Sequence, residues 1–241
     1  MMDKIKLFCL PYAGGSAAVY KYWEQYLHDR IELFPIELAG RGSRIGEPFY
    51  GSVEEALEDI HRIIISNLEE QPYALFGHSM GSVLVYELAY RIKELGHPYP
   101  VHMFISGRYP PGFVSKKKVL YDLPDKEFVD EVFKLGGTPK EVLKSNELME
   151  LFLPILRADF RITDTYRHIE KNAKLDCDIS VLWGKREKGA TIFDVAKWHD
   201  YTSKSCKIHM FDGDHFFIHD YKKDVAAIIN SSLIDFADNG M

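Results

Sequence analysis

The sequence predicts an α/β fold, in which a mostly parallel sheet is flanked by helices and carries one helical insertion. Three observations lead to this prediction. Short apolar runs alternate with amphipathic helical patterns along most of the chain. The alternation stops between about Arg108 and Lys171, where no clear strand is found, and then resumes. The length of 241 residues suits one domain of this class.

The first part of the chain supplies four expected strands and three expected helices. The strands are the apolar runs at residues 4–10, 31–38, 72–77 and 101–107. The helices are the amphipathic segments between them, at residues 17–29, 52–70 and 82–96. Ser52 is the expected N-cap of the second helix, and Glu55 completes a capping box three residues later. Gly96 is expected to end the third helix.

The remainder of the chain is expected to hold the insertion and two more strands. Helical patterns at residues 125–137 and 146–166 predict a helical lid or substrate-shaping cap, with a packing layer that has no such role as the alternative. Strands follow at 178–184 and 206–213, and helices at 191–202 and 221–237. The single domain would then consist of a core of about residues 1–107 and 172–241 and a lid insertion of about residues 108–171.

Composition excludes several classes of function. The net charge is −6, and the short run Ser115–Val119 is the nearest approach to a basic patch, so nucleic acid is not an expected partner. The apolar run Ile5–Leu10 is too short for a signal-peptide core or a membrane span, so no membrane association is expected. Three cysteines at unrelated spacings suggest neither a disulfide framework nor a zinc site. These features predict a cytoplasmic protein.

The segment Gly77-His-Ser-Met-Gly81 is the strongest catalytic signal. It joins an expected strand directly to an expected helix, which is the setting of a nucleophile elbow. Such a turn pushes the hydroxyl of Ser79 clear of the sheet, and side chains at Gly77 or Gly81 would collide with neighbouring backbone. We therefore predict that Ser79 is a nucleophile; the alternative is a tight turn without chemistry.

The expected oxyanion donors are two backbone N–H groups. The N–H of Met80, the residue after the nucleophile, lies at the N-terminus of the following helix, where the helix dipole favours negative charge. The second donor should come from the loop after the first strand, where two glycines allow close backbone approach. We assign it to the N–H of Ala13, with Tyr12 as the alternative.

The expected general base is His215. In the layout that goes with this elbow, the order along the chain is serine, acid, histidine, and the histidine follows the last strand. His215 lies in such a loop, whereas its rival His219 lies nearer the final helix. The side chain of His78 should leave the elbow on another side from Ser79 and pack at the rim of the site.

The expected acid lies on the loop after the strand at residues 178–184. Glu187 comes three residues after Gly184, and Asp194 comes further on, where a helix is expected. Either carboxylate could accept a hydrogen bond from the imidazole. We favour Glu187 and keep Asp194 as the alternative.

The chain resembles the stand-alone type II thioesterases of nonribosomal peptide and polyketide synthesis. The insertion segments, which begin LPD…F…LGG.P and end LP.LRAD…..Y, are more specific to that family than the elbow. The matching segments are Cys9–Ala17, Glu37–Arg44, Phe76–Ser82, Ile105–Pro111, Leu123–Pro139, Leu151–Tyr166 and Phe211–Phe217. Two departures are visible: that family usually has Asp in a Gly-X-Asp-Asp type loop where this chain has Glu187, and often Pro where it has Ala39.

The resemblance implies an α/β-hydrolase fold with a helical lid. It implies hydrolysis of thioesters between acyl or aminoacyl groups and the phosphopantetheine arm of carrier proteins, with Ser79 as nucleophile and His215 as base and with no metal or cofactor. An acidic carrier protein would meet a local basic or apolar patch, for which Arg108 and Lys116–Lys118 are candidates beside ordinary surface charge. A monomer is expected. The alternatives are a carboxylesterase of small esters and a non-catalytic binding protein with this fold.

Overall fold

The centre of the structure is a sheet of six parallel strands. The computed structural model describes residues 4–68, 71–113, 118–137 and 145–239. The order of the strands across the sheet is β2-β1-β3-β4-β5-β6, and each neighbouring pair is parallel. The predicted parallel sheet is therefore confirmed. The strands are β1 (Ile5–Leu10), β2 (Ile31–Pro35), β3 (Tyr73–His78), β4 (His102–Ser106), β5 (Asp178–Gly184) and β6 (Cys206–Phe211).

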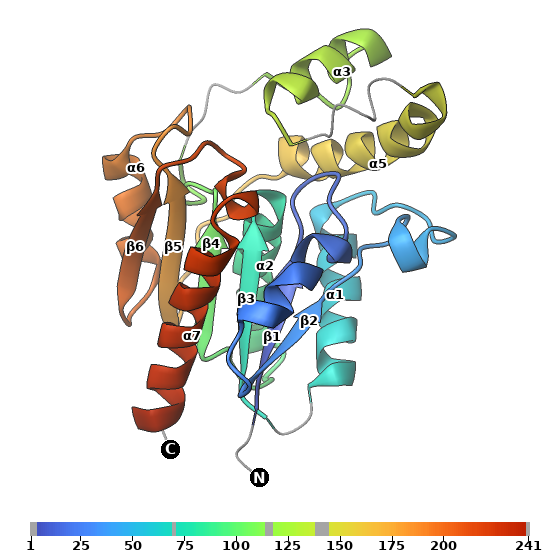
Figure 1. The fold of residues 1–241 in the computed structure, drawn as a ribbon. Helices are drawn as coiled ribbons and strands as arrows, with labels where there is room; N and C mark the ends of the chain where they lie inside the picture. Colours follow the sequence, from blue (N-terminus) through green and yellow to red (C-terminus); the bar gives the residue numbers. More distant parts are fainter. Residues whose placement is uncertain (1–3, 69–70, 114–117, 138–144, 240–241) are drawn as a thin grey trace.

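Helices cover both faces of the sheet, as Figure 1 shows. On one face lie α1 (Val53–Asn67) and α2 (Met80–Glu94), packed against alternate strand residues such as Phe8 and Leu75. On the other face lie α7 (Lys222–Asn239) and the 3₁₀ segment η1 (Ala17–Tyr26), packed against the intervening residues such as Leu7 and Phe76. The central strands are buried on both faces, which is why their sequences are continuous apolar runs.

The two ends of the chain meet on this second face. Asn230 of α7 donates from its side-chain amide to the carbonyl of Tyr26 at 2.9 Å, and its oxygen accepts from the His28 amide at 2.9 Å. The guanidinium of Arg30 is paired with Asp238 at 2.8 Å. The N-terminal and C-terminal segments therefore form one continuous layer.

Two expected helices take a different form. The segment predicted as a helix over residues 17–29 is the 3₁₀ segment η1, in which Tyr20 and Trp23 are buried. A spacing of three residues places both on one edge of a 3₁₀ helix, where side chains at i and i+3 eclipse. The helix expected at 191–202 is divided into α6 (Ile192–Ala196) and a 3₁₀ turn, η3 (Lys197–Tyr201).

The N-terminal ends of α1 and α2 differ in detail from expectation. Ser52 caps α1 as predicted by accepting from the Glu55 amide, but the Glu55 carboxylate binds the amide of Gly51 rather than that of Ser52. Helix α2 begins at Met80, two residues earlier than expected, so that Ser79 is its N-cap. The elbow thus leads into the helix without an intervening loop.

The insertion lies above the carboxyl ends of the strands, where α3 (Asp125–Lys134) rests on α5 (Asn146–Thr165) (Figure 1). Phe128 and Val132 of α3 pack with Leu156 of α5 in a small apolar cluster. Ile162 of α5 belongs to the main core, so α5 is packed against the sheet layer as well as against α3. The short 3₁₀ turns η2 (Gly42–Arg44) and η4 (Phe217–His219) lie in loops around the same edge of the sheet.

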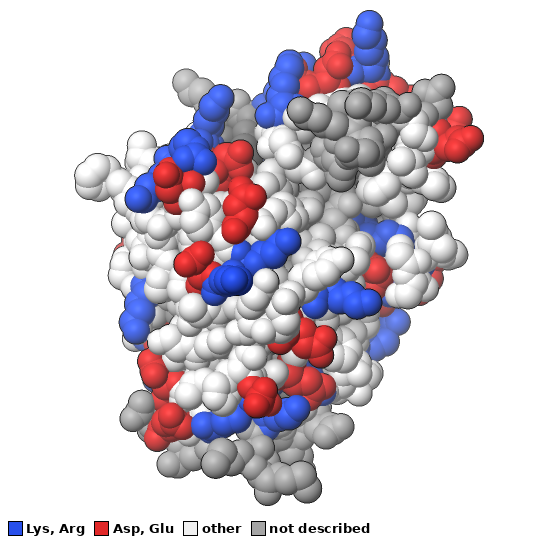
Figure 2. All heavy atoms as spheres, viewed as in Figure 1, with Lys and Arg blue, Asp and Glu red and all other residues white. Residues whose placement is uncertain are grey.

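Charge is mixed on the face that Figure 2 displays, where lysines and arginines alternate with aspartates and glutamates. Arg108 stacks its guanidinium on the Tyr109 ring at 4.6 Å, and Lys118 is exposed. Lys116 and Lys117 lie outside the described residues. Within the described ranges, no helix is long and apolar enough to cross a membrane. All three cysteines are free and buried.

Candidate active site

The candidate site lies at the carboxyl edge of the sheet, where the strand order reverses. The chain goes from β1 outward to β2 and returns to β3 on the other side of β1. The loops after β1 and β3 therefore diverge from adjacent strands, which is where open parallel sheets bind ligands. Ala13 follows β1 and Ser79 follows β3, so two of the predicted site residues come from this point.

Ser79 occupies a strained turn. Its backbone angles are φ 55° and ψ −108°, and it is the one non-glycine residue with positive φ in the described part of the chain. Its amide donates to the carbonyl of Ser106 at 2.8 Å. The hydroxyl of Ser82 lies 2.7 Å from the Gly77 carbonyl and 2.9 Å from the Ser106 carbonyl, so it ties the end of β4 to the start of α2.

The glycines of the elbow are required by close backbone contacts. A Cβ on Gly77 would lie 2.2 Å from the carbonyl oxygen of Gly81. A Cβ on Gly81 would lie 2.2 Å from the carbonyl oxygen of Leu10, at the end of β1. Gly81 therefore allows α2 to approach the loop that carries Ala13.

His215 and Glu187 are brought together. The Nδ1 atom of His215 lies 2.6 Å from Oε1 of Glu187, and the Glu187 side chain is only 9% exposed. The two loops that carry them are joined by backbone hydrogen bonds, from Lys185 to Phe211 at 2.8 Å and from Arg186 to Gly213 at 2.9 Å. Glu187 is thus positioned by the same pairing that joins β5 to β6.

Asp194, the alternative acid, is engaged elsewhere. Its carboxylate accepts from the amide of Thr191 at 2.9 Å and from the Thr191 hydroxyl at 2.7 Å, while Thr191 caps α6 in return. These hydrogen bonds hold the pKa of Asp194 below its usual value. The structure therefore uses Asp194 as a helix cap.

The imidazole of His215 lies close to the elbow, next to Gly107 and His78. A Cβ on Gly107 would lie 3.3 Å from Cε1 of His215, and Gly107 directly follows Ser106, which accepts the Ser79 amide. The ring of His78, the residue before Ser79, is 5.1 Å from the ring of His215. Nδ1 of His215 binds Glu187, so Nε2 is the ring nitrogen that remains available; the hydrogen bonds of the described residues include none between His215 and Ser79.

His78 is a buried wall of the site, in line with its expected packing role. Its Nδ1 lies 2.8 Å from the hydroxyl of Ser106, and the side chain is fully buried. Burial holds its pKa well below the ordinary value, with the neighbouring imidazoles of His215 and His219 adding to the effect. A neutral ring beside His215 adds no competing positive charge.

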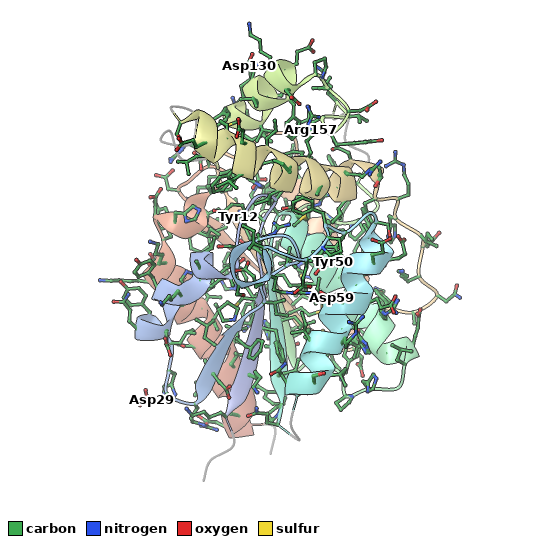
Figure 3. All side chains as sticks on the ribbon, turned by 90° about the vertical axis from the view of Figure 1, so that its right-hand side faces the viewer. Tyr12, Asp29, Tyr50, Asp59, Asp130 and Arg157 are labelled. Carbon is green, nitrogen blue, oxygen red and sulfur yellow. The ribbon has the colours of Figure 1, made fainter. Side chains whose placement is uncertain are left out.

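His219 is paired with Tyr12 instead of with an acid. The Tyr12 hydroxyl lies 3.1 Å from Nε2 of His219, and burial raises the pKa of Tyr12 to about 12. Figure 3 shows Tyr12 between the end of the sheet and α5. The Tyr12 ring also packs edge-on against Phe216 at 5.0 Å, and a Cβ on Gly137, after α3, would lie 2.1 Å from Cζ of Phe216. The insertion thus touches the residue that follows His215.

The loop after β1 leaves the amides of both candidate donors, Ala13 and its alternative Tyr12, available to an oxyanion. The amide of Gly15 donates to the Tyr12 carbonyl at 2.8 Å, and the amide of Gly14 donates to Asp159 at 2.7 Å. Among the hydrogen bonds of the described residues, neither the amide of Ala13 nor that of Tyr12 is a donor, so Tyr12 stays the alternative. Met80 is the first residue of α2, and the first-turn amides of a helix have no partner within it.

Sequence reasoning missed Arg41 and Asp159, which lie against this loop. Arg41 is 3% exposed, Asp159 is 1% exposed, and the two form a bidentate ion pair. The sequence of α5 does contain a feature that could have pointed to Asp159. Asp159 falls on the helix face that Leu156 and Ile162 bury, so a charge stands at an apolar position.

Nothing in the site suggests a metal centre. In the part of the chain that is described, no group of three or more histidine, cysteine, aspartate or glutamate side chains could hold an ion. What the arrangement can do is activate a serine hydroxyl with an imidazole that a carboxylate orients.

The sequence and the structure were compared with known proteins. The family model described as Thioesterase domain matches residues 5–233. "Linear gramicidin dehydrogenase LgrE" of Brevibacillus parabrevis is 35% identical over 233 residues, which cover 95% of this chain and 88% of that protein. ClbQ from the colibactin NRPS/PKS pathway has a crystal structure that is 35% identical and superposes with a TM-score of 0.94, covering 99% of this chain and 100% of ClbQ.

A third similar protein carries the name of the expected class. The type II thioesterase BorB from the borrelidin biosynthetic cluster is 31% identical, with a TM-score of 0.85 over 95% of this chain and 93% of BorB. The similarity therefore extends over nearly the whole length of all three proteins.

Proposed function

The chain belongs to the thioesterase family, and we propose on that premise that it hydrolyses thioesters on carrier proteins of a peptide or polyketide assembly line. The groups removed would be acyl or aminoacyl groups held on the phosphopantetheine arm, which clears wrongly loaded or stalled carriers. The observation that carries the proposal is the Glu187–His215 pair beside the strained Ser79 turn, at the carboxyl edge of the sheet.

The mechanism follows from the positions of these groups. Nε2 of His215 takes the proton of Ser79 as Oγ attacks the thioester carbonyl, and Glu187 stabilises the resulting imidazolium. The amides of Met80 and Ala13 stabilise the oxyanion, and one such donor is worth about 10²–10³ in kcat. As the tetrahedral intermediate collapses, the C–S bond breaks and His215 returns its proton to the leaving thiolate.

The second half of the reaction releases the acid. A water molecule gives its proton to His215 and attacks the acyl-enzyme carbonyl, and the same two amides stabilise the new oxyanion. When the bond to Oγ breaks, His215 returns the proton to Ser79. The balance requires one water per thioester and no redox partner, so the proposed groups suffice.

The name of the relative LgrE raises a redox function as a second candidate. A dinucleotide-binding loop has the form G-x-G-x-x-G between the first strand and a helix. This chain has Pro11-Tyr-Ala-Gly-Gly-Ser-Ala17 after β1, and Gly14 and Gly15 do not fit that spacing. The residues at the site favour acyl transfer over hydride transfer.

The decisive test uses carrier protein loaded with an acyl group. Wild type should release the free acid and leave the phosphopantetheine thiol, both followed by mass spectrometry. Ser79→Ala should lose this activity by several orders of magnitude, because the remaining groups cannot form the acyl-enzyme. Ser231→Ala, on the exposed side of α7, is the matched control and should retain full activity.

Two further measurements separate the alternatives. A free ester of the same acyl group should be hydrolysed far less efficiently than the loaded carrier; equal kcat/KM on both would favour a general carboxylesterase. A serine-directed fluorophosphonate should label wild type at Ser79. Absence of labelling in a folded protein would favour a binding protein without catalysis.

A further inference from the structure

A buried ion pair joins the insertion to the loop that carries Ala13. Arg41, in the loop after β2, places its two terminal nitrogens 2.5 and 2.6 Å from the two carboxylate oxygens of Asp159 on α5. Both side chains are almost fully buried, with 4% and 1% of their surface exposed. Burial favours the neutral form of Arg41, yet the hydrogen bonds and charge of Asp159 outweigh that effect and raise its pKa.

Both members of the pair also bind the backbone of the Ala13 loop. Asp159 accepts from the amide of Gly14 at 2.7 Å, and Arg41 donates to the carbonyl of Gly15 at 3.1 Å. Gly14 has φ 80°, a conformation open to glycine, and a Cβ there would lie 2.5 Å from Leu156 of α5. Two consecutive residues after Ala13 are therefore fixed by the pair.

This anchoring sets the direction of the Ala13 amide. The Ala13 amide shares its peptide plane with the Tyr12 carbonyl, which accepts from the amide of Gly15 at 2.8 Å. With Gly14 and Gly15 bound to Asp159 and Arg41, this plane cannot turn without breaking hydrogen bonds that the buried pair holds in place. On the other side, Gly81 packs against the Leu10 carbonyl, which fixes the start of the same loop next to α2. The amide of Ala13 lies between these two fixed points.

Stability alone gives a weak reason for such a pair. Removing two charges from water carries a desolvation penalty. A protein in which apolar side chains of similar volume replace a buried ion pair is often as stable as the original, or more stable. A buried pair can, however, specify one arrangement of a backbone segment. Any other arrangement of that segment would leave the buried charges unpaired.

We propose that Arg41 and Asp159 are positioning residues for the oxyanion site, which couple the place of α5 to the direction of the Ala13 amide. The inference rests on the proposed function, since it needs Ala13 to be an oxyanion donor. Neither side chain touches the reacting atoms. Their effect would be on stabilisation of the tetrahedral intermediate, and so on kcat rather than on KM.

The test replaces the whole pair by apolar side chains. Arg41→Met/Asp159→Leu removes both charges together, so neither is left buried without its partner. We expect an unfolding temperature within a few degrees of wild type, a kcat on a small acyl thioester reduced about 10–100-fold, and a KM within about twofold. A short alkyl boronic acid, whose tetrahedral serine adduct places an oxygen in the oxyanion site, should lose affinity by a factor similar to that in kcat.

The control is a second ion pair on the far side of α2. Glu87 binds Lys171 at 2.7 Å and the hydroxyl of Tyr166 at 2.6 Å, without contact to the Ala13 loop in the hydrogen bonds of the described residues. Glu87→Leu/Lys171→Met should leave kcat and boronic-acid affinity within about twofold of wild type. Equal losses of kcat in both double variants would overturn the proposal.

Other outcomes are equally decisive. A folded Arg41→Met/Asp159→Leu protein with wild-type kcat and boronic-acid affinity would show that the pair is structural only. If this variant does not fold, Asp159→Asn decides, because its amide oxygen can still accept from Gly14 while the ion pair with Arg41 is lost. In the folded protein kcat and boronic-acid affinity should both fall about tenfold with KM within about twofold, and wild-type values of both would contradict the proposal. Wild type that hydrolyses no thioester would instead refute the proposed function, and the boronic acid would still test the anchoring.

Discussion

At Ser79 the backbone lies in a region that an L-residue rarely adopts, and the surrounding contacts hold it there. The Ser106 carbonyl takes its amide, and the Ser82 hydroxyl ties Gly77 to the end of β4. Strain of this kind persists only where neighbours impose it, and it is concentrated at functional sites. The strained turn therefore supports Ser79 as the proposed nucleophile. Single substitutions can also test which of the two candidate acids, Glu187 or Asp194, acts with His215.

Replacing Glu187 by Gln should lower kcat by on the order of 10²–10⁴-fold, because an amide cannot hold His215 in the required tautomer or stabilise its charged form. Asp194→Asn should change kcat by less than threefold, since that side chain caps α6. Steady-state kinetics on a small thioester compare the two. If Asp194→Asn shows the larger loss, Glu187 is not the acid.

At the scale of elements, the sheet was easier to predict than the helices around it. Strand β5 has the predicted bounds, because residues 179–184 are all buried and most of them are apolar. The segment at 17–26 buries Tyr20 and Trp23, and a spacing of three suits either kind of helix, so periodicity alone could not identify the 3₁₀ form. The division of the segment at 191–202 was missed for a similar reason.

The contact of α2 with β1 gives a prediction at this scale. Gly81→Ala should destabilise the fold and remove activity, because the new methyl group would meet the Leu10 carbonyl, which is backbone and cannot rotate away. Overpacking of this kind costs about 1–3 kcal/mol, and sometimes more. Unfolding in denaturant measures this loss of stability.

Gly46→Ala is the control, since Gly46 has open space where its Cβ would be. Its stability and kcat should stay near wild type. Were Gly81→Ala as stable and active as Gly46→Ala, the close approach of α2 to the Ala13 loop would not be required.

For the whole molecule, the site joins residues that sequence reasoning treats separately. The elbow is local, so Ser79 and Met80 are predicted from one short motif. His215 is predicted from chain order and Glu187 from its distance from a strand end, and the structure brings these two side chains together. Arg41 and Asp159, which form an ion pair, are 118 residues apart in the sequence, and no local sequence pattern predicts their contact. Such a long-range contact between buried charges is visible only in the folded structure.

Stability should depend on pH through a histidine far from the site. His102 is buried on β4 with Nε2 2.9 Å from the Ser180 hydroxyl, and burial lowers its pKa to about 4; Asp178, Lys207 and His209 are the charged and titratable groups that also act on it. Between pH 6.5 and 4 the unfolded chain binds a proton that the folded protein does not. The free energy of unfolding therefore falls as the pH is lowered through this window, and this group contributes up to about 3 kcal/mol to that loss of stability.

His102→Gln should reduce that pH dependence, whereas His199→Gln, at an exposed position, should leave it unchanged. Urea unfolding at several pH values between 4 and 7 provides the comparison. An unchanged slope in His102→Gln would mean that other groups account for the loss. His78, whose pKa is also lowered by burial, contributes in the same direction.

The layer in which η1 packs beside α7 has a consequence for the order of events during synthesis. Tyr26 and His28 leave the ribosome early, but their partner Asn230 emerges about 200 residues later. Until then one face of the central strands lacks its cover, and the loop of His215 has only just been made. Part of one apolar face of the sheet is therefore covered only when α7 is made, about 200 residues after Tyr26. Transiently exposed apolar surface of this kind makes a growing chain prone to aggregate.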